Sequence, residues 1–278
     1  MSLPPNTAPA MRSNGRAPSG NNLRLKTVAL RIGFFGVLIL IWQLIATMKL
    51  VPEFVFPAPK AVLLKFVEIW NDGTLFKSVT ESLRRMLVGY SISIVGGLTI
   101  GILAARSWLF KETLGTAIMS LQSLPSVCWL PFALVWIGLS ESAILAVLIL
   151  GALFSIAVAT EGAIRNISPI YLKVGRVMGA RGFRFAFDIL FFAALPELIG
   201  GLKLGWTFAW RSLMAAELIR NDVAGVGHLL EIGRNFNDIA LMIAAMLVIL
   251  AIGMVVDQLI FGSLERIIRR RYGLEKNI

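Results

Sequence analysis

Charged side chains are rare in the apolar parts of this sequence, so the few that occur there are the first candidates for chemistry. Arg211 and Glu217 both lie within one apolar run, Leu195 to Ile219. A charge in hydrocarbon costs at least about 2.5–3.5 kcal/mol, so such a residue usually faces a cavity or a protein partner. Three interpretations of Arg211 are open: pairing with a carboxylate or helix-end carbonyls, attraction of an anion in a permeation path, or snorkelling to the outer surface.

Motifs that carry catalysis are absent from the sequence. The single Cys, Cys128, excludes an intramolecular disulfide, and the single His, His228, leaves no cluster for zinc. The phosphate loop G-x-x-x-x-G-K-[ST] does not occur, and neither does H-E-x-x-H or G-x-S-x-G. No pair of acids lies in the middle of an apolar run to relay protons. We therefore expect no catalytic residue, no metal and no cofactor in this chain.

The composition is that of a membrane protein. Hydrophobic residues make up 57% of the 278 residues, charged residues only 15%, and the mean hydropathy is +0.78. Soluble domains contain about 45–50% apolar and about 25% charged residues. The net charge of +11 would suggest nucleic acid in a soluble protein. In a membrane protein, basic loops usually report topology instead, so the expected partner is the lipid bilayer and not nucleic acid.

Six apolar runs are each long enough to span a bilayer at 1.5 Å per residue. Backbone polar groups in lipid must pair within the segment, and no alternation of period two is present, so these runs are expected to be helices. The predicted fold class is an all-α membrane protein with six transmembrane helices. The runs are Thr27–Met48, Leu87–Ala105, Thr113–Leu139, Ser142–Thr160, Leu195–Ile219 and Ile239–Phe261.

The third run contains Pro125 and Pro131, and each proline removes a backbone donor from the helix. A kinked or broken helix is expected there. Ordinary tolerance of proline in membrane helices and irregular backbone facing a polar path are both open. Trp129, between the prolines, is either an interface anchor or a pore-lining residue. The candidate substrate path consists of Pro125, Trp129, Pro131, Arg211 and Glu217.

Lys and Arg residues indicate the orientation. With the N-terminus in the cytoplasm, sixteen of them fall in cytoplasmic segments and eight in outer segments, and both termini lie inside. Arg84 and Arg85, at the entrance of the second run, are exceptions. Residues 1–22, rich in Pro, Asn, Ser and Gly, predict a disordered cytoplasmic tail. Residues 23–86 comprise the first transmembrane helix and an outer loop, in which the apolar spacing from Val62 to Val67 predicts an amphipathic helix.

Residues 87–278 form the remaining core, with a basic cytoplasmic connector at 161–194. Ser168-Pro169 is a helix start, a hydroxyl cap followed by proline at the first helical position. Ile170, Val174, Val177 and Arg181 then share one face, and Gly182 is a plausible stop. Two interpretations are open: an interfacial helix on anionic lipid, or a docking element for a soluble partner. The docking element gains weight because uphill transport would need energy from another chain.

Glycines recur at positions that favour close contacts. Gly97 and Gly101, and likewise Gly201 and Gly205, are small-xxx-small pairs that predict close helix packing. On the connector, glycine is a poor helix former, so each glycine needs a reason. Close approach of a partner is expected at Gly179, and local turn chemistry is expected at Gly175 and Gly182.

The connector and four further stretches resemble a known family. They are similar to permease subunits of bacterial ATP-binding-cassette importers of the nitrate/sulfonate/taurine/bicarbonate group. The family's cytoplasmic motif has Glu-Ala-Ala, then Gly, then Ile, then Leu-Pro. Here Gly179 and Ile189 match, Lys173-Val174-Gly175 replaces Glu-Ala-Ala, and Phe191-Phe192 replaces Leu-Pro. The other similar stretches are FPAPKAVL, ESLRRMLVGY, SLPSVCWLPFALVWIGLSES and GGLKLGWTFAWRSLMAAELI.

The resemblance implies a type I importer permease of the MetI-like fold in the bacterial inner membrane. It implies two copies of this chain, two ATPase subunits that bind ATP-Mg, and an extracytoplasmic solute-binding protein that delivers a small solute, which is expected to be anionic. The ATPase-coupling residues would be Lys173, Val174, Gly175, Val177, Met178, Gly179, Ala180 and Arg181. The rival hypotheses are a self-sufficient carrier driven by an ion gradient, which would need acids or a broken-helix pair in both halves, and an intramembrane enzyme.

Overall fold

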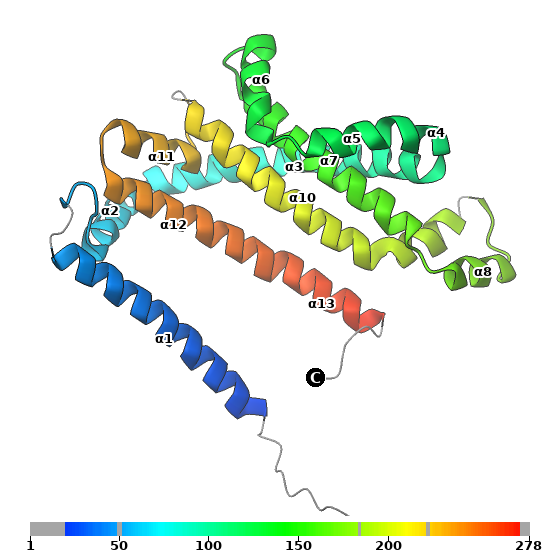
Figure 1. The fold of residues 1–278 in the computed structure, drawn as a ribbon, viewed down its shortest axis with the longest axis horizontal. Helices are drawn as coiled ribbons and strands as arrows, with labels where there is room; N and C mark the ends of the chain where they lie inside the picture. The colour runs from blue at the N-terminus through cyan, green and yellow to red at the C-terminus, as the bar shows by residue number, and fades with distance from the viewer. Residues whose placement is uncertain (1–19, 49–51, 183–184, 221–222, 273–278) are drawn as a thin grey trace, which may run out of the picture. The chain divides into compact units, whose positions relative to one another are not determined.

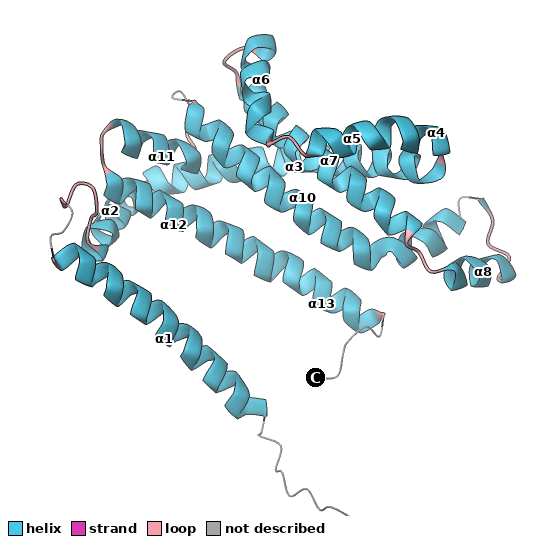
Figure 2. Cartoon of the chain, viewed as in Figure 1, coloured by secondary structure: helices cyan, strands magenta, loops and turns pink. Residues whose placement is uncertain are grey.

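The computed structural model describes residues 20–48, 52–182, 185–220 and 223–272. Within these ranges the chain is built of helices joined by turns, without a strand (Figure 2). The predicted all-α class is therefore confirmed. The first nineteen residues of the predicted tail lie outside the described ranges, and helix α1 begins at Gly20. The chain divides into two compact units, Met1–Pro59 and Lys60–Ile278.

The first unit contains one long helix, α1 (Gly20–Thr47). Its stretch from Ala29 to Thr47 is apolar enough and long enough to span a membrane. A short connection folds back along its end, where the indole nitrogen of Trp42 donates to the carbonyl oxygen of Pro57 over 3.0 Å. The Trp42 ring also meets Phe56 edge to face. Helix α1 therefore corresponds to the first predicted span, Thr27–Met48.

The second unit contains four long apolar segments. They are α3 (Thr74–Arg106), α7 (Glu141–Arg165), α10 (Phe192–Ile219), and α12 (Ile239–Val255) continued through a π-helical turn, Val256–Phe261, into α13 (Gly262–Arg271). Helix α7 packs against both α3 and α10, and α10 also contacts α13 (Figure 1). Helix α3 starts thirteen residues before the predicted Leu87. Its amphipathic first half buries Leu75, Ser82 and Met86 on one face.

Shorter elements connect these segments. Helix α2 (Pro59–Asn71) is the predicted amphipathic helix, and it buries Val62 and Ile69. Helix α8 (Pro169–Val177) occupies the predicted connector, and a π-helical turn, Phe185–Phe191, leads into α10. Helix α11 (Val226–Asn235) joins α10 to α12. The third predicted span, Thr113–Leu139, corresponds to several short elements: α4 (Trp108–Phe110), a π-helical turn (Lys111–Gly115), α5 (Thr116–Gln122), a 3₁₀ turn (Ser126–Trp129) and α6 (Leu130–Ile137).

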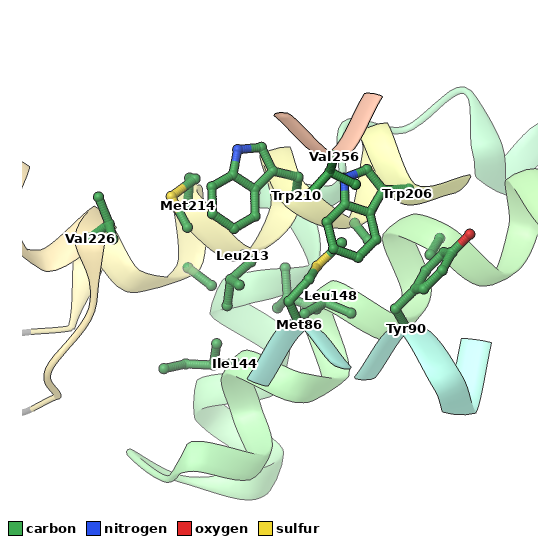
Figure 3. Close-up of a cluster of buried hydrophobic side chains, with 14 of the residues drawn as sticks. Met86, Tyr90, Ile144, Leu148, Trp206, Trp210, Leu213, Met214, Val226 and Val256 are labelled. Carbon is green, nitrogen blue, oxygen red and sulfur yellow. The ribbon is translucent and has the colours of Figure 1, made fainter. Parts of the chain in front are cut away.

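The core lies between α3, α7 and α10. Figure 3 shows Met86 and Tyr90 from α3 beside Leu148 from α7 and two tryptophans, Trp206 and Trp210, from α10. The Tyr90 ring meets Trp206 edge to face at 5.3 Å, and its hydroxyl donates to the Leu202 carbonyl oxygen over 2.7 Å. A buried tyrosine is stabilised when its hydroxyl finds such a partner.

The small-xxx-small pairs pack as predicted, and α7 is their common partner. A Cβ at Gly101 would lie 2.5 Å from the Cβ of Thr160, and a Cβ at Gly201 would lie 2.4 Å from that of Ala159. The second glycine of α10, Gly205, lies equally close to Ile156. Without these glycines the helix backbones could not approach to this distance. They set the position of α10 and therefore of the charged residues that it carries.

Candidate functional site

The span that contains both prolines is broken. The helical stretches Trp108–Gln122 and Ser126–Ile137 meet at an angle of 102°, and α6 packs against α7. Pro125 takes φ −54° and ψ 129°, which ends the helix before it and precedes the 3₁₀ turn. Pro131 falls in the first turn of α6, where a missing backbone donor costs nothing. The predicted break is confirmed, and Pro125 rather than Pro131 marks its position.

A cavity of about 280 Å³ lies at this break. Its lining comes from the broken span, from α7 and from α10, and it includes three of the predicted substrate-path residues: Pro125, Trp129 and Arg211. The other two, Pro131 and Glu217, do not line it. The polar lining residues are Gln122, Ser123, Ser126, Ser155 and Arg211. The cavity thus combines apolar walls with a few polar groups, as small-molecule sites usually do.

Arg211 is exposed on the cavity side of α10. In the part of the chain that the structure describes, it makes no ion pair with a carboxylate and no hydrogen bond with a helix-end carbonyl. Its position lies well inside the span Asp188–Ile219. A guanidinium keeps its charge in proteins and presents five donors. The cavity therefore contains a cation with free donors, which suits an anion.

Glu217 lies in a different environment, fully buried between α10, α3 and α11. Its carboxylate accepts hydrogen bonds from the Ser82 hydroxyl at 2.7 Å, from Arg85 Nη1 at 2.8 Å and from the Gly227 backbone N–H at 3.1 Å. A Cβ at Gly225 would lie 2.4 Å from this carboxylate. Because both its oxygens are engaged, we assign Glu217 to the packing of α10 against α3 and α11.

Arg85 is the residue that sequence reasoning missed. It is 4% exposed and bridges Glu217 to Glu141, which lies 3.0 Å from its Nε, and it also donates to the Ala224 carbonyl oxygen. The neighbouring Arg84 contacts Glu141 and Glu81 from an exposed position. The available signal was the adjacent pair Arg84-Arg85 at the entrance of an apolar run. Carboxylates lie within ion-pair distance of both guanidinium groups.

The connector exposes most of its predicted coupling residues. Helix α8 starts at Pro169 as predicted, and Val177 and Met178 are 89% and 74% exposed. Lys173, Val174, Gly179 and Arg181 are exposed as well, Ala180 is half-buried, and Gly175 is buried. Val177 and Met178 thus form an exposed apolar surface at the end of α8.

Each glycine of the connector has its own local environment. Gly179 has φ +77°, and its N–H and that of Ala180 donate to the carbonyl oxygens of Arg176 and Gly175, the hydrogen bonds of a Schellman motif. At Gly175 the expectation of turn chemistry is wrong, because a Cβ there would lie 2.9 Å from the Phe185 ring and 3.0 Å from Ile189. Gly182 has φ +58° and is a turn glycine as expected. The helix itself ends at Val177, before Gly182.

Comparisons with known proteins agree with this architecture. A family model described as "Binding-protein-dependent transport system inner membrane component" matches residues 97–272. The putative aliphatic sulfonates transport permease protein SsuC of Bacillus subtilis is 29% identical over 225 residues, which cover 81% of each chain. The bicarbonate transport system permease protein CmpB of Synechocystis is 28% identical over 234 residues, which cover 81% of this chain and 84% of the relative.

The fold is similar to that of a solved transporter. A chain of the inward-facing MetNI methionine ABC transporter superposes with a TM-score of 0.61 and 20% identity, covering 71% of this chain and 95% of that chain. The spans, the broken helix and the exposed connector define a membrane-embedded transport subunit. The chain belongs to the family of binding-protein-dependent transport system inner membrane components, within the nitrate/sulfonate/taurine/bicarbonate group of ABC importer permeases. It is a permease subunit, not an enzyme, and ATP hydrolysis belongs to a separate subunit.

Proposed function

We propose that this permease imports a small anion and that the cavity at the broken span lies on its path. The observation that carries the proposal is the exposed Arg211, which faces the cavity from within a span. A guanidinium keeps its charge and presents a planar set of donors that matches a small oxyanion. Seryl and amide groups of the same cavity, Ser126, Ser155 and Gln122, offer further hydrogen bonds.

The solute class follows from the relatives and from the size of the cavity. The similar permeases are named for aliphatic sulfonates and for bicarbonate. A volume of about 280 Å³ is near the lower limit of ordinary ligand pockets, which begin at about 300 Å³. We therefore propose a small oxyanion such as nitrate, bicarbonate or a short alkylsulfonate as the solute.

We further propose the assembly that such a path requires. Two copies of this chain pair in the cytoplasmic membrane, with both termini inside, and an extracytoplasmic binding protein delivers the anion. Two ATPase subunits that bind ATP-Mg dock on the exposed surface of α8 and the Gly179 turn. Their closure on ATP moves α8, and the helices switch between inward- and outward-facing states. Close contact of the ATPase with Gly179 is supported by the open space around its Cα.

An anion-import assay tests the proposal. The complete transporter, reconstituted in vesicles with its ATPases and binding protein, is compared with Arg211→Gln and with Arg234→Gln, an exposed arginine at the end of α11. Removal of the Arg211 charge should lower anion import at least about tenfold while the thermal midpoint moves little, because the fold does not use this guanidinium. Arg234→Gln should import normally. Loss of folding in Arg211→Gln, or unchanged import, would contradict the proposed role.

A further inference from the structure

The 3₁₀ turn that covers the cavity is held to the bundle by polar contacts at both ends. Gln122 Nε2 donates to the Ser155 hydroxyl over 3.3 Å, which ties the end of α5 to α7. At the other end the hydroxyls of Ser126 and Ser212 lie 2.6 Å apart, which ties the turn to α10. Ser212 directly follows Arg211 in the chain. The contact therefore joins the broken span to the helix position that carries the cavity's cation.

The direction of this hydrogen bond follows from proton counting. Ser212 is fully buried, and its hydroxyl also lies 2.7 Å from the Phe208 carbonyl oxygen, which can only accept. A hydroxyl has one hydrogen, so Ser212 donates it to Phe208 and accepts the hydrogen of Ser126. Ser126 is thus the donor that holds the turn to α10, and alanine at 126 removes the contact outright.

Gly151 on α7 makes room for this contact. A Cβ at position 151 would lie 2.1 Å from Ser212 Oγ and 3.3 Å from the Cβ of Ser126. Even alanine would therefore push the two serines apart. Within or beside the turn, Leu124, Val127 and Cys128 are exposed, whereas Trp129 packs against the hydrophobic core.

We propose that Ser126, Ser212 and Gly151 are positioning residues that hold the broken span over Arg211 and so set how far the cavity opens. The turn follows a 102° break and has a single short 3₁₀ stretch, whose own hydrogen bonds are weak. The serine contact is the hydrogen bond that fixes the turn to α10. The effect on anion uptake rests on the proposed function, whereas the position of the turn does not.

Cys128 provides a reporter of the turn's position. It is the only cysteine of the chain, it is exposed, and it lies two residues after Ser126. A nitroxide label on Cys128 of the assembled transporter in lipid nanodiscs reports by electron paramagnetic resonance how freely the turn moves. Ser126→Ala should raise the ratio of mobile to immobile label about fivefold, as expected for one lost hydrogen bond. Ser126→Thr, which keeps the hydroxyl, should restore the wild-type ratio.

Matched variants distinguish loss of the Ser126–Ser212 contact from an unspecific increase in the mobility of the turn. Ser123 also lines the cavity, but its hydroxyl bonds to Ser120 in its own segment, so Ser123→Ala should leave the spectrum unchanged. Gly151→Ala should act as Ser126→Ala does, and the double variant should be no more mobile than the more mobile single variant, because both remove one contact. In anion uptake, Ser126→Ala should raise KM more than it lowers kcat.

Either of two results would overturn the proposal: a wild-type spectrum for Ser126→Ala, or independent, additive effects in the double variant. If the transporter that carries Gly151→Ala fails to assemble, Ser212→Ala replaces Gly151→Ala as the single variant and in the double variant. A transporter that shows the expected spectra but does not take up anions would contradict the proposed function and leave the positioning role standing.

Discussion

Arg85 and Glu217, which are 132 residues apart in the chain, form a buried ion pair with 2.8 Å between Nη1 and Oε1. The pair joins α3 to α10, and the N–H of Gly227 adds α11 to the same carboxylate. Burying two charges is costly, and an ion pair in this setting offsets that cost only when its hydrogen bonds are complete. Here the carboxylate has three donors, so α3, α10 and α11 are fixed together at this point.

Removal of the Glu217 carboxylate should strongly destabilise the second unit. Glu217→Ala leaves the guanidinium of Arg85 buried with one carboxylate fewer, and we expect a loss of about 3–5 kcal/mol in unfolding free energy. The matched control is Arg84→Ala, whose side chain is 51% exposed, with an expected loss of at most about 1 kcal/mol. Denaturant unfolding of the detergent-solubilised chain measures both. Equal losses of unfolding free energy in the two variants would mean that burial of the Arg85–Glu217 pair does not contribute to stability.

Alanine substitution of two adjacent glycines in α10 should change the stability of the protein in opposite directions. Gly200 has no atom within 4 Å of a Cβ, and alanine there should stabilise the helix by up to about 1 kcal/mol. Gly201 faces the Cβ of Ala159 at 2.4 Å, so alanine there should cost about 1–3 kcal/mol through overpacking. Thermal unfolding of both variants in one detergent gives the comparison. Stabilisation by Gly201→Ala would refute close contact with α7.

Two substitutions at Gly179 should distinguish its role in the Schellman turn from its proposed role in ATPase docking. Asn tolerates the left-handed region, so Gly179→Asn keeps the Schellman turn. Gly179→Glu places a long charged side chain on the proposed ATPase contact and strains the turn. We expect Gly179→Glu to release the ATPase subunit or to uncouple transport, with the membrane fold intact, and Gly179→Asn to retain at least half of the transport. Co-purification and uptake assays decide this, and normal uptake in Gly179→Glu would count against docking there.

The purified chain should not hydrolyse ATP. Its sequence has no phosphate loop, and its family assigns hydrolysis to another subunit. Phosphate release should stay at background until the ATPase subunit is added. Robust turnover by a preparation free of that subunit would refute the assignment of roles.

The spans could be predicted from the sequence to within a few residues in most cases, because length and apolarity define a membrane helix. The run Leu195–Ile219 corresponds to α10 at Phe192–Ile219, and the prolines predicted the break in the third run. The early start of α3 escaped prediction because residues from Thr74 onward are amphipathic and contain charges. Those charges are tolerated because partners from distant helices neutralise them.

The site could be predicted only in part. Arg211, Pro125 and Trp129 were recognisable as unusual residues in apolar runs, and the fold brings them to one cavity. The pairing of Glu217 with Arg85 was not recognisable, because single-sequence patterns report neighbours at three and four residues and not contacts between helices. The close contact at Gly175 escaped prediction for the same reason, since it comes from the segment that follows the turn.

The π-helical turn Val256–Phe261 has a consequence for the orientation of α13. Each residue of an α-helix advances the chain by about 100° around the axis, so deletion of one residue within this turn would rotate everything beyond it by about that amount. The Tyr272 hydroxyl, which now donates to the Phe192 carbonyl oxygen at the start of α10, would then point elsewhere. The π-helical turn thus sets the rotation of α13 about its axis and aligns the end of the last span with the start of α10.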